Sequence, residues 1–204
     1  MDVRQHWETI YATKAATELS WFQRCPSASL ELVQLAAPGH DARIIDVGGG
    51  ASTLADHLLD AGYEHVTVLD VSAGALDQAR RRLDTRAASV RWIESDVLTA
   101  ELPSRAFDVW HDRAVFHFLT DASDRRRYVA QLAGALAPTG HAVIGTFAED
   151  GPTRCSGLEV RRYSPAELAA ELGSSFELVE SRRESHHTPS GAEQRFAFSI
   201  FRRT

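Results

Sequence analysis

The sequence predicts a single α/β domain, Rossmann-like and doubly wound around a mostly parallel β-sheet, and two observations carry this prediction. From residue 43 onward, short apolar runs alternate with longer amphipathic runs, which is the pattern of strand–helix–strand units. A chain of 204 residues with 44% hydrophobic and 25% charged residues can bury one substantial core. We therefore expect one domain over residues 1–204, with a helical segment at 1–37 and a ligand-binding core at 38–204.

In the first part of the core, each strand and helix can be predicted from local sequence signals. The expected strands are the apolar runs at residues 43–47, 65–70, 90–96, 107–112 and 141–147. Helices are expected between them at 54–61, which Gly62 ends, at 72–83 behind a Ser72 cap, and at 124–138, which Pro138 ends. Helices therefore cover both faces of the sheet.

The second part begins with a segment rich in helix breakers. Residues 148–160 contain Gly151, Pro152 and Gly157 and predict a loop over one end of the sheet. A helix follows at 164–173, opened by a Ser164 cap and a proline in its first turn. Residues 176–184 and 193–203 predict a final antiparallel pair of strands, joined by a loop at 185–192.

Charge and composition exclude some classes of partner. The chain has 22 Lys and Arg residues against 28 Asp and Glu residues, a formal net charge of -6. It therefore lacks the overall positive field of a typical nucleic-acid-binding protein, and we expect no nucleic-acid partner. No window approaches the roughly 18 uninterrupted apolar residues of a membrane span, and the N-terminus does not resemble a signal peptide.

Two cysteines, Cys25 and Cys155, are too far apart in sequence to form a zinc motif or a disulfide framework. Together with the missing signal peptide, this favours a cytoplasmic protein. Both cysteines fall in segments expected to cover the same sheet edge, which leaves open a role with thiols or metalloids.

Three consecutive glycines, Gly48, Gly49 and Gly50, lie between the first expected strand and its helix. In a doubly wound sheet this loop lies at the ligand-binding edge. Glycine lets the backbone approach a ligand closely and tolerates positive φ. The following helix is expected to offer free N–H groups from about Ser52 onward to a negatively charged group.

Two aspartates end the neighbouring strands at informative positions. Asp70 follows Gly48 by 22 residues, close to the spacing at which an acidic residue meets ribose hydroxyls. Asp96 ends the third strand, where it can accept a hydrogen bond from an adenine amine, and Val97 offers its backbone. Tight turns and helix caps are the structural alternatives, but the combination favours a nucleoside ligand.

The order "DVGGGAS", "VLDVS", "ESDV" and "FDVWHD" resembles motifs one to four of the class I S-adenosylmethionine-dependent methyltransferases. The resemblance runs from about residue 40 to the end of the chain. It implies a seven-stranded sheet whose last strand is antiparallel, with S-adenosylmethionine as the cofactor. Gly48 and Gly50 match the first motif of the family, whereas Ser52 stands at its third glycine position.

The resemblance also implies a role for each matching position. The glycines would contact the methionine part of the cofactor, Asp70 its ribose and Asp96 with Val97 its adenine. An N-terminal lid would close over it, with Phe22 among its aromatic candidates. The complete expected set of cofactor-binding residues is Tyr11, Trp21, Asp46, Gly48, Gly49, Gly50, Ser52, Asp70, Val71, Asp96, Val97 and His111.

A nicotinamide enzyme is the rival interpretation of the same sheet. It would require glycine at position 53 to complete G-x-G-x-x-G, but this position is Thr53. Lys14 is the only lysine, so no Tyr-x-x-x-Lys pair exists.

The expected catalytic residues follow the fourth strand. His111 and His117 are candidates for the base that a hydroxyl or ammonium acceptor needs. Arg113 would lie beside the transferred methyl group and pair with Asp112 or with the cofactor. The alternative for His117 is a packed, hydrogen-bonded core residue. No metal is expected, because His186 with its neighbour lies in a predicted loop without further ligands at metal-binding spacing.

Three hypotheses on the function stay open, and the first two differ in the methyl acceptor. The short chain and its covering N-terminal segment favour a small molecule, with an oxygen, nitrogen or sulfur atom as the acceptor. "SWFQ" and "FDVWHDRAVFHFL" also loosely resemble elongation-factor lysine methyltransferases, which keeps a protein substrate open. A non-catalytic cofactor sensor or partner subunit is the third hypothesis, and the oligomeric state is undetermined.

Overall fold

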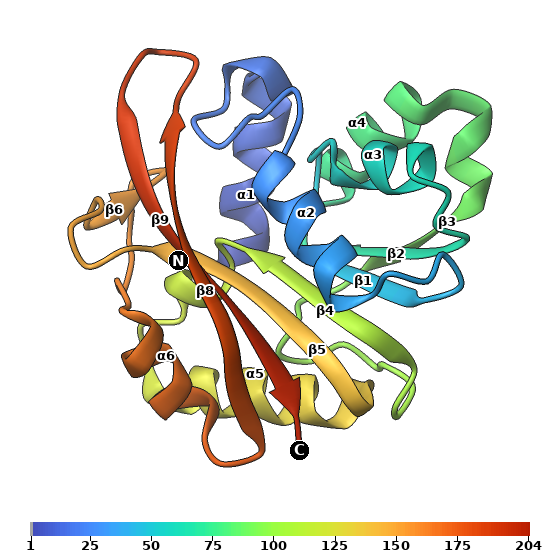
Figure 1. Ribbon diagram of the computed structural model, residues 1–204. Helices are drawn as coiled ribbons and strands as arrows, with labels where there is room; N and C mark the ends of the chain where they lie inside the picture. The colour runs from blue at the N-terminus through green and yellow to red at the C-terminus, as the bar shows by residue number, and fades with distance from the viewer. Residues whose placement is uncertain (1) are drawn as a thin grey trace.

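The protein folds around one seven-stranded sheet with helices on both faces, as a computed structural model describing residues 2–204 shows (Figure 1). The strand order is β3-β2-β1-β4-β5-β9-β8. All neighbouring strands are parallel except at β9, which runs antiparallel to both β5 and β8. The predicted fold class is thereby confirmed.

The strands are β1 Arg43–Val47, β2 His65–Asp70, β3 Val90–Glu94, β4 Phe107–Arg113, β5 Leu136–Phe147, β6 Arg154–Cys155, β7 Leu158–Glu159, β8 Phe176–His187 and β9 Glu193–Arg203. The α-helices are α1 Val3–Thr13, α2 Ser27–Ala36, α3 Leu54–Asp60, α4 Ala73–Leu83, α5 Ala122–Ala135 and α6 Pro165–Leu172. Short 3-10 turns cover Ala16–Glu18, Asp84–Ser89 and Phe116–Phe118. No helix within residues 2–204 is both long and apolar enough to cross a membrane.

The helices divide between the two faces of the sheet. Apolar side chains of α2, α3 and α4 pack with one face, where Ile44, Val66 and Val109 are buried. Those of α5 and α6 pack with the other, where Ile45 and Trp110 are buried. The alternation of Ile44 and Ile45 between the faces follows from the two-residue period of a strand.

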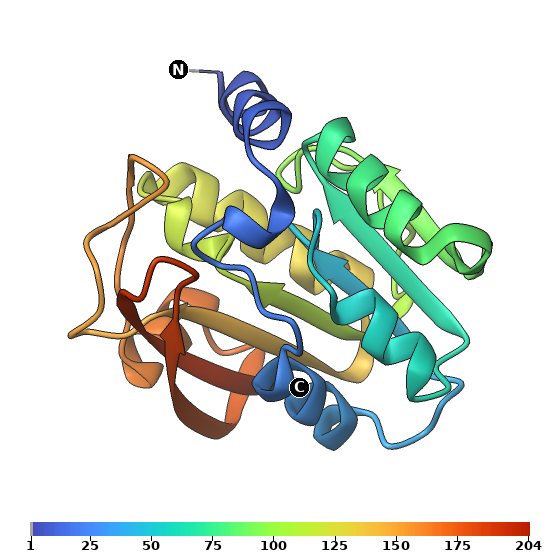
Figure 2. The same ribbon diagram turned by 90° about the horizontal axis from the view of Figure 1, so that it is seen from above.

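The predicted helical segment at 1–37 contains α1, a short turn and α2, and Met1 lies outside the described residues. Helix α1 lies beyond the carboxyl end of β4, apart from the two helical layers (Figure 2). It contacts α4, whereas α2 packs on β4 and β5. The N-terminal segment thus crosses the sheet edge at which ligands bind in doubly wound folds.

Local sequence signals define several boundaries as expected. The Ser72 hydroxyl accepts a hydrogen bond of 3.1 Å from the Ala75 N–H and caps α4. At α6, Ser164 and Glu167 form a capping box, with proline in the first turn and a glycine after the last.

Two predicted boundaries, at the end of α5 and at the end of β8, are wrong. Helix α5 ends at Ala135, three residues before Pro138, and β5 begins at once. Proline restricts the residue before it to extended backbone, and the β4–β5 register shifts here. The loop predicted at 185–192 is shorter, because β8 continues through His186 and His187, which pair with Gln194 and Glu193.

A buried hydrogen-bond chain ties β4 to α5. The Trp110 indole donates to the Tyr128 hydroxyl over 2.8 Å, and this hydroxyl donates to Asp112 Oδ2 over 2.6 Å. The Asp112 carboxylate also accepts from the N–H groups of Val115 and Phe116. All three side chains are buried and cannot contact water. Each of these hydrogen bonds therefore replaces one that the group makes with water in the unfolded chain.

We expect Tyr128→Phe to lower the free energy of unfolding by about 1–3 kcal/mol, because it leaves the Trp110 N–H without a partner and removes one of the three donors to the Asp112 carboxylate. Tyr163→Phe is the matched control, since the Tyr163 hydroxyl is buried but has no hydrogen-bond partner within residues 2–204. Urea unfolding of the three proteins measures both effects. Equal losses from the two substitutions would contradict the role given to the chain of hydrogen bonds.

Candidate functional site

The glycine loop is built so tightly that no side chain fits. Gly48 has φ +66° and Gly50 has φ +42°, as the positive-φ prediction expected. A Cβ atom on Gly48 would lie 2.0 Å from a methyl group of Val115. One on Gly50 would lie 2.8 Å from both Asp70 Oδ2 and the Tyr11 hydroxyl. The loop therefore packs directly against the ends of β2 and β4 and against α1.

The predicted set of free N–H groups after this loop is only partly present. The Ser52 N–H donates to the Gly49 carbonyl over 2.7 Å, and the Leu54 N–H donates to the Ser52 hydroxyl over 3.1 Å. Helix α3 begins at Leu54 and has seven residues. Thr53, the position that a nicotinamide enzyme would fill with glycine, donates its hydroxyl to the Gln23 carbonyl over 2.9 Å. Ser52 thus stabilises the loop itself, whereas Thr53 joins the loop to the N-terminal segment.

A cavity of about 380 Å³ opens at the carboxyl ends of the parallel strands. One half of it is lined by the ends of β1 and β2 and the loop after β3, including five expected cofactor-binding residues: Gly48, Asp70, Val71, Asp96 and Val97. The predicted third strand stops at Glu94, so Asp96 lies in a turn and not at a strand end, and its carboxylate accepts from the Leu98 N–H over 2.8 Å.

Asp70 carries an unusual charge environment in this cavity. Its Oδ1 accepts from the Ser72 N–H over 2.8 Å. Burial, followed by the negative charges of Asp46 and Glu8, raises the pKa of Asp70 to about 7. The carboxyl group is therefore partly protonated at neutral pH.

Aromatic side chains form the roof of the cavity. Trp7 and Tyr11 of α1 both line it, together with Trp21. The Trp7 and Trp21 rings meet edge to face at 5.6 Å between centroids, and Trp7 meets Phe118 at 5.3 Å. The predicted lid residues Tyr11 and Trp21 thus lie over the cavity, and Phe22 lines a smaller cavity next to it.

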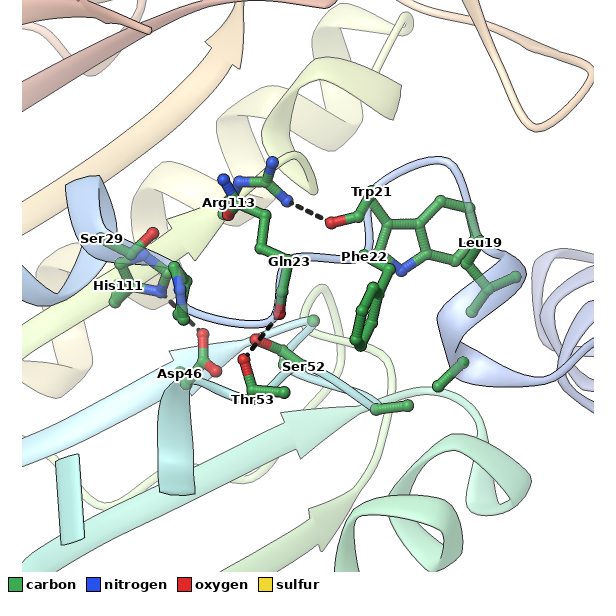
Figure 3. A pocket seen from close by; sticks show the side chains of 15 residues that line it. Leu19, Trp21, Phe22, Gln23, Ser29, Asp46, Ser52, Thr53, His111 and Arg113 are labelled. Atoms are coloured by element: carbon green, nitrogen blue, oxygen red, sulfur yellow. Dashed lines mark hydrogen bonds and ion pairs between the residues drawn. The ribbon is translucent and has the colours of Figure 1, made fainter. Parts of the chain in front are cut away.

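This smaller cavity, of about 40 Å³, lies between the glycine loop and the segment after α1 (Figure 3). At its base Asp46 of β1 and His111 of β4 are register partners, and His111 Nδ1 donates to Asp46 Oδ1 over 2.7 Å. The Nε2 atom of His111 is buried without a hydrogen-bond partner among the described residues. His111 lines this cavity and is not one of the side chains that line the larger one.

Arg113 lines both cavities. Its Nη1 donates to the Trp21 carbonyl over 3.0 Å, and its guanidinium carbon lies 4.7 Å from the centre of the Phe196 ring. The Nε and Nη2 atoms are buried and have no protein partner in the part of the chain that the structure describes. The predicted ion pair with Asp112 is wrong, because neighbouring residues of a strand point to opposite faces and Asp112 binds Tyr128 on the other side.

His117 is packed in the core beside the site. Its ring lies 4.4 Å from Phe118 and 4.8 Å from Phe147, between centroids. Burial and the charge of Arg113 lower its pKa to about 3, so the imidazole is neutral at pH 7. The structure confirms that His117 is packed in the core but not that it is hydrogen-bonded, because neither nitrogen has a hydrogen-bond partner within the described chain. The catalytic role stays a prediction.

For the far wall of the larger cavity, the sequence indicated only the 148–160 segment with Cys155. Cys155 and Leu158 of the β6–β7 hairpin and Gln194 and Phe196 of β9 line it. Trp7 was also missed, although its spacing of four residues from Tyr11 places both on one face of a helix and was a usable signal. Nothing local marks Phe196, because its position depends on the pairing of β9 with β5.

Of the remaining histidine and cysteine predictions, only Cys155 lines the larger cavity. His186 Nε2 contacts the Ser20 carbonyl at 2.7 Å, which joins β8 to the N-terminal segment. Cys25 is exposed and Cys155 is buried. Across residues 2–204, no group of three or more His, Cys, Asp and Glu side chains is arranged to hold a metal ion.

Asp70→Asn should stabilise the ligand-free protein at pH 8 by about 1–3 kcal/mol, because Asn removes a charge whose burial is unfavourable. A raised native pKa means that the stability contributed by the neutral form is present near pH 4 and is lost as pH rises through about 7. The advantage of the variant should therefore shrink between pH 8 and pH 4 in thermal unfolding. A constant difference in melting temperature across this range would contradict the raised pKa.

Comparison with known proteins identifies related sequences. Residues 44–140 match the family described as "Methyltransferase domain". An uncharacterized methyltransferase of Mycobacterium bovis is 34% identical over 104 residues, 51% of this chain and 50% of that protein. Nodulation protein S of Rhizobium tropici is 33% identical over 125 residues, with 61% and 51% covered. Release factor glutamine methyltransferase of Chlorobaculum tepidum is 35% identical over 162 residues, with 70% and 55% covered.

These alignments span little more than half the length of each relative. Solved structures share the whole fold at low sequence identity. The Burkholderia thailandensis 1,6-didemethyltoxoflavin-N1-methyltransferase, with bound 1,6-didemethyltoxoflavin and S-adenosylhomocysteine, aligns with a TM-score of 0.72 and 21% identity, covering 98% of this chain and 84% of that one. The N-methyltransferase NodS of Bradyrhizobium japonicum, in complex with S-adenosylhomocysteine, aligns with a TM-score of 0.71 and 19% identity, covering 96% and 97%. The chain therefore matches the methyltransferase family over residues 44–140, and its sheet order and glycine loop agree with the fold of the S-adenosylmethionine-dependent methyltransferases.

Proposed function

We propose that this chain transfers the methyl group of S-adenosylmethionine to a small-molecule acceptor. One observation carries the proposal: a single cavity joins seven of the residues expected to bind the cofactor to an aromatic chamber under α1 and the β6–β7 hairpin. A concave chamber of this size suits a small molecule better than a polymer. Nodulation protein S and the toxoflavin methyltransferase support a small acceptor by analogy, while the release factor enzyme keeps a protein acceptor as the second candidate.

The residues present fit the cofactor. Gly48 and Gly50 bring bare backbone to the cavity edge, and a Cβ atom would close this space. Asp70 presents the carboxylate that ribose hydroxyls require, and Asp96 and Val97 line the same half of the cavity. We assign Asp46 to the ammonium of the methionine part, with Ser52, Gly49, Tyr11, Trp21 and Val71 as the surrounding contacts of the cofactor.

When bound, the cofactor supplies an electrophilic methyl group on a sulfonium. The bond to sulfur breaks as the acceptor atom forms its own bond to that carbon, so the protein contributes mainly alignment and exclusion of water. His111 holds the Asp46 carboxylate over 2.7 Å and acts as a positioning residue in this proposal. His117 is neutral and weakly basic, so we assign the rate enhancement to positioning by the cavity walls more than to a histidine base.

The first experiment is calorimetric titration with S-adenosylmethionine, S-adenosylhomocysteine, NAD and NADP. We expect binding of the first two, and Asp70→Ala should weaken it by roughly tenfold or more because the ribose loses its charged acceptor. Exposed Asp77 of α4 provides the control variant Asp77→Ala, which should bind normally. Binding of NAD alone, or of none of the four, would overturn the assignment of the cofactor.

The protonation of Asp70 predicts a pH dependence of cofactor binding. With a pKa of about 7 in the free protein, the ionised form that accepts from hydroxyl groups becomes scarce in acid. Affinity for S-adenosylhomocysteine should therefore fall by about tenfold per pH unit below pH 7, and binding at pH 6.5 should release a proton. Calorimetry in two buffers of different ionisation enthalpy measures this release. Asp70→Asn should bind weakly and without the pH dependence; an equally flat wild type would contradict the linkage.

Transfer of a labelled methyl group separates the three hypotheses on function. The protein is incubated with methyl-labelled cofactor and either the low-molecular-mass fraction or the protein fraction of a cell extract. Label in the small-molecule fraction supports the proposal, and label on proteins supports the second candidate. Binding of the cofactor without labelling of either fraction supports a sensor. The cytoplasmic location and the absence of a nucleic-acid partner stay predictions.

A further inference from the structure

The far half of the larger cavity contains a cation without a complete set of partners. The Arg113 guanidinium uses one nitrogen on the Trp21 carbonyl, whereas Nε and Nη2 are buried without a partner within residues 2–204. These two nitrogens form one edge of the planar guanidinium, the fork that matches a carboxylate in geometry. Buried donors of a charged group are unfavourable when unpaired, so their position at a cavity points to a ligand that accepts from them.

The walls around this cation are aromatic. Arg113 lies over the face of Phe196, and Trp7, Phe118 and Leu158 line the same chamber. The rings of Trp7 and Phe118 contact each other edge to face. A chamber bounded by ring faces and aliphatic side chains favours a flat apolar body, because such a body buries its own surface without leaving polar atoms unpaired.

Gln194 adds a second polar group on this wall. Its side chain lines the cavity, and Oε1 is buried without a partner among the described residues. Glu184 acts on Arg113 by its charge, but its own hydrogen bond of 2.9 Å comes from Gln23. Glu184 forms no hydrogen bond with Arg113, so Nε and Nη2 stay without a partner among the described residues.

We propose that the methyl acceptor is a small aromatic acid whose anionic oxygens are bound by the Nε and Nη2 edge of Arg113, with its ring between Phe196, Trp7 and Phe118. The inference rests on the proposed function, since it names the substrate class of the same cavity. Arg113 is then a specificity-determining residue, and Gln194 is placed to accept from a further O–H or N–H group of the ring. The anionic group serves to bind the acceptor, and the proposal does not assign the atom that is methylated.

The competing ligand for Arg113 is the carboxylate of the cofactor, and the position of the guanidinium argues against it. The guanidinium rests on Phe196 of β9, on the side of the β6–β7 hairpin. The negative charge of Glu184 acts on it more strongly than that of Asp46 beside the glycine loop. The open edge thus belongs to the half of the chamber away from the strand ends that hold the nucleoside.

The test compares three probes of one shape and different charge: 2-naphthoate, 2-naphthamide and 2-naphthylmethylammonium. Each is titrated by calorimetry or ligand-observed NMR into the whole protein, with and without saturating S-adenosylhomocysteine. We expect 2-naphthoate to bind at least about tenfold more tightly than the neutral amide, because a bidentate carboxylate satisfies both open donors. The ammonium probe should bind least.

Arg113→Gln should abolish this preference while leaving the affinity for 2-naphthamide and for S-adenosylhomocysteine within about threefold of wild type. Arg91→Gln, an exposed arginine of β3, is the matched control and should retain the preference. Gln194→Glu is a second variant on the same wall. Its added negative charge should remove the preference for 2-naphthoate even where Arg113→Gln fails to fold.

Each other outcome overturns the inference. A preference for the amide or the ammonium probe excludes an anionic acceptor, and a preference retained in both variants excludes Arg113 as its binding group. A loss of S-adenosylhomocysteine affinity in Arg113→Gln assigns the guanidinium to the cofactor. Failure of the wild type to bind S-adenosylhomocysteine overturns the proposed function separately, since the probe titrations without it still report the charge preference.

Discussion

The site depends on the absence of side chains at three consecutive positions. Where Cβ atoms of Gly48, Gly49 and Gly50 would lie, the structure already has atoms of Val115, Asp46 and Asp70. The loop after β1 is therefore the point at which β2, β4 and α1 converge. Any larger residue there would push these segments apart, so the same three glycines define both the edge of the cavity and the position of the residues around it.

Buried charge is the second constraint on this site. Burial raises the pKa of Asp70 to about 7 and that of Asp112 to about 6, although Asp112 has three hydrogen-bond donors and Asp70 accepts from a backbone N–H. The two carboxylates nevertheless serve different ends. The oxygens of Asp112 accept hydrogen bonds that stabilise the fold, whereas Asp70 lines the cavity. A ligand that hydrogen-bonds to Asp70 would relieve an unfavourable feature of the free protein, which is typical of residues kept for binding.

The parts of the structure that could be predicted from sequence are those with local signals. The strands and helices between residues 43 and 83 follow from apolar periodicity, a serine cap and glycines, and all of them lie where expected. The cofactor-side residues Asp70 and Val71 could be placed because a parallel strand carries its carboxyl end to a known edge of the sheet. Local periodicity was therefore sufficient to place the residues at the end of β2.

Predictions failed where a distant partner decides the structure. Pro138 was expected to end a helix, but pairing of β5 with β4 begins before it. His186 was expected in a loop, but pairing with Gln194 extends β8. The geometry of a strand separates Asp112 from Arg113, and only the tertiary fold brings Phe196 beneath the guanidinium. None of these contacts leaves a trace in nearby sequence.

The division between local and distant determinants also separates the two halves of the cavity. Gly48, Asp70 and Asp96 of the cofactor half all fall within residues 44–140, the span that matches the family. The far half draws Trp7 from before that span and the residues of β6, β7 and β9 from after it. Arg113 lies within the matched span, but Phe196, which packs against its guanidinium, lies outside that span. The family match therefore covers the half of the cavity to which we assign the cofactor, whereas the proposal for the acceptor rests on the aromatic walls and the unpaired guanidinium.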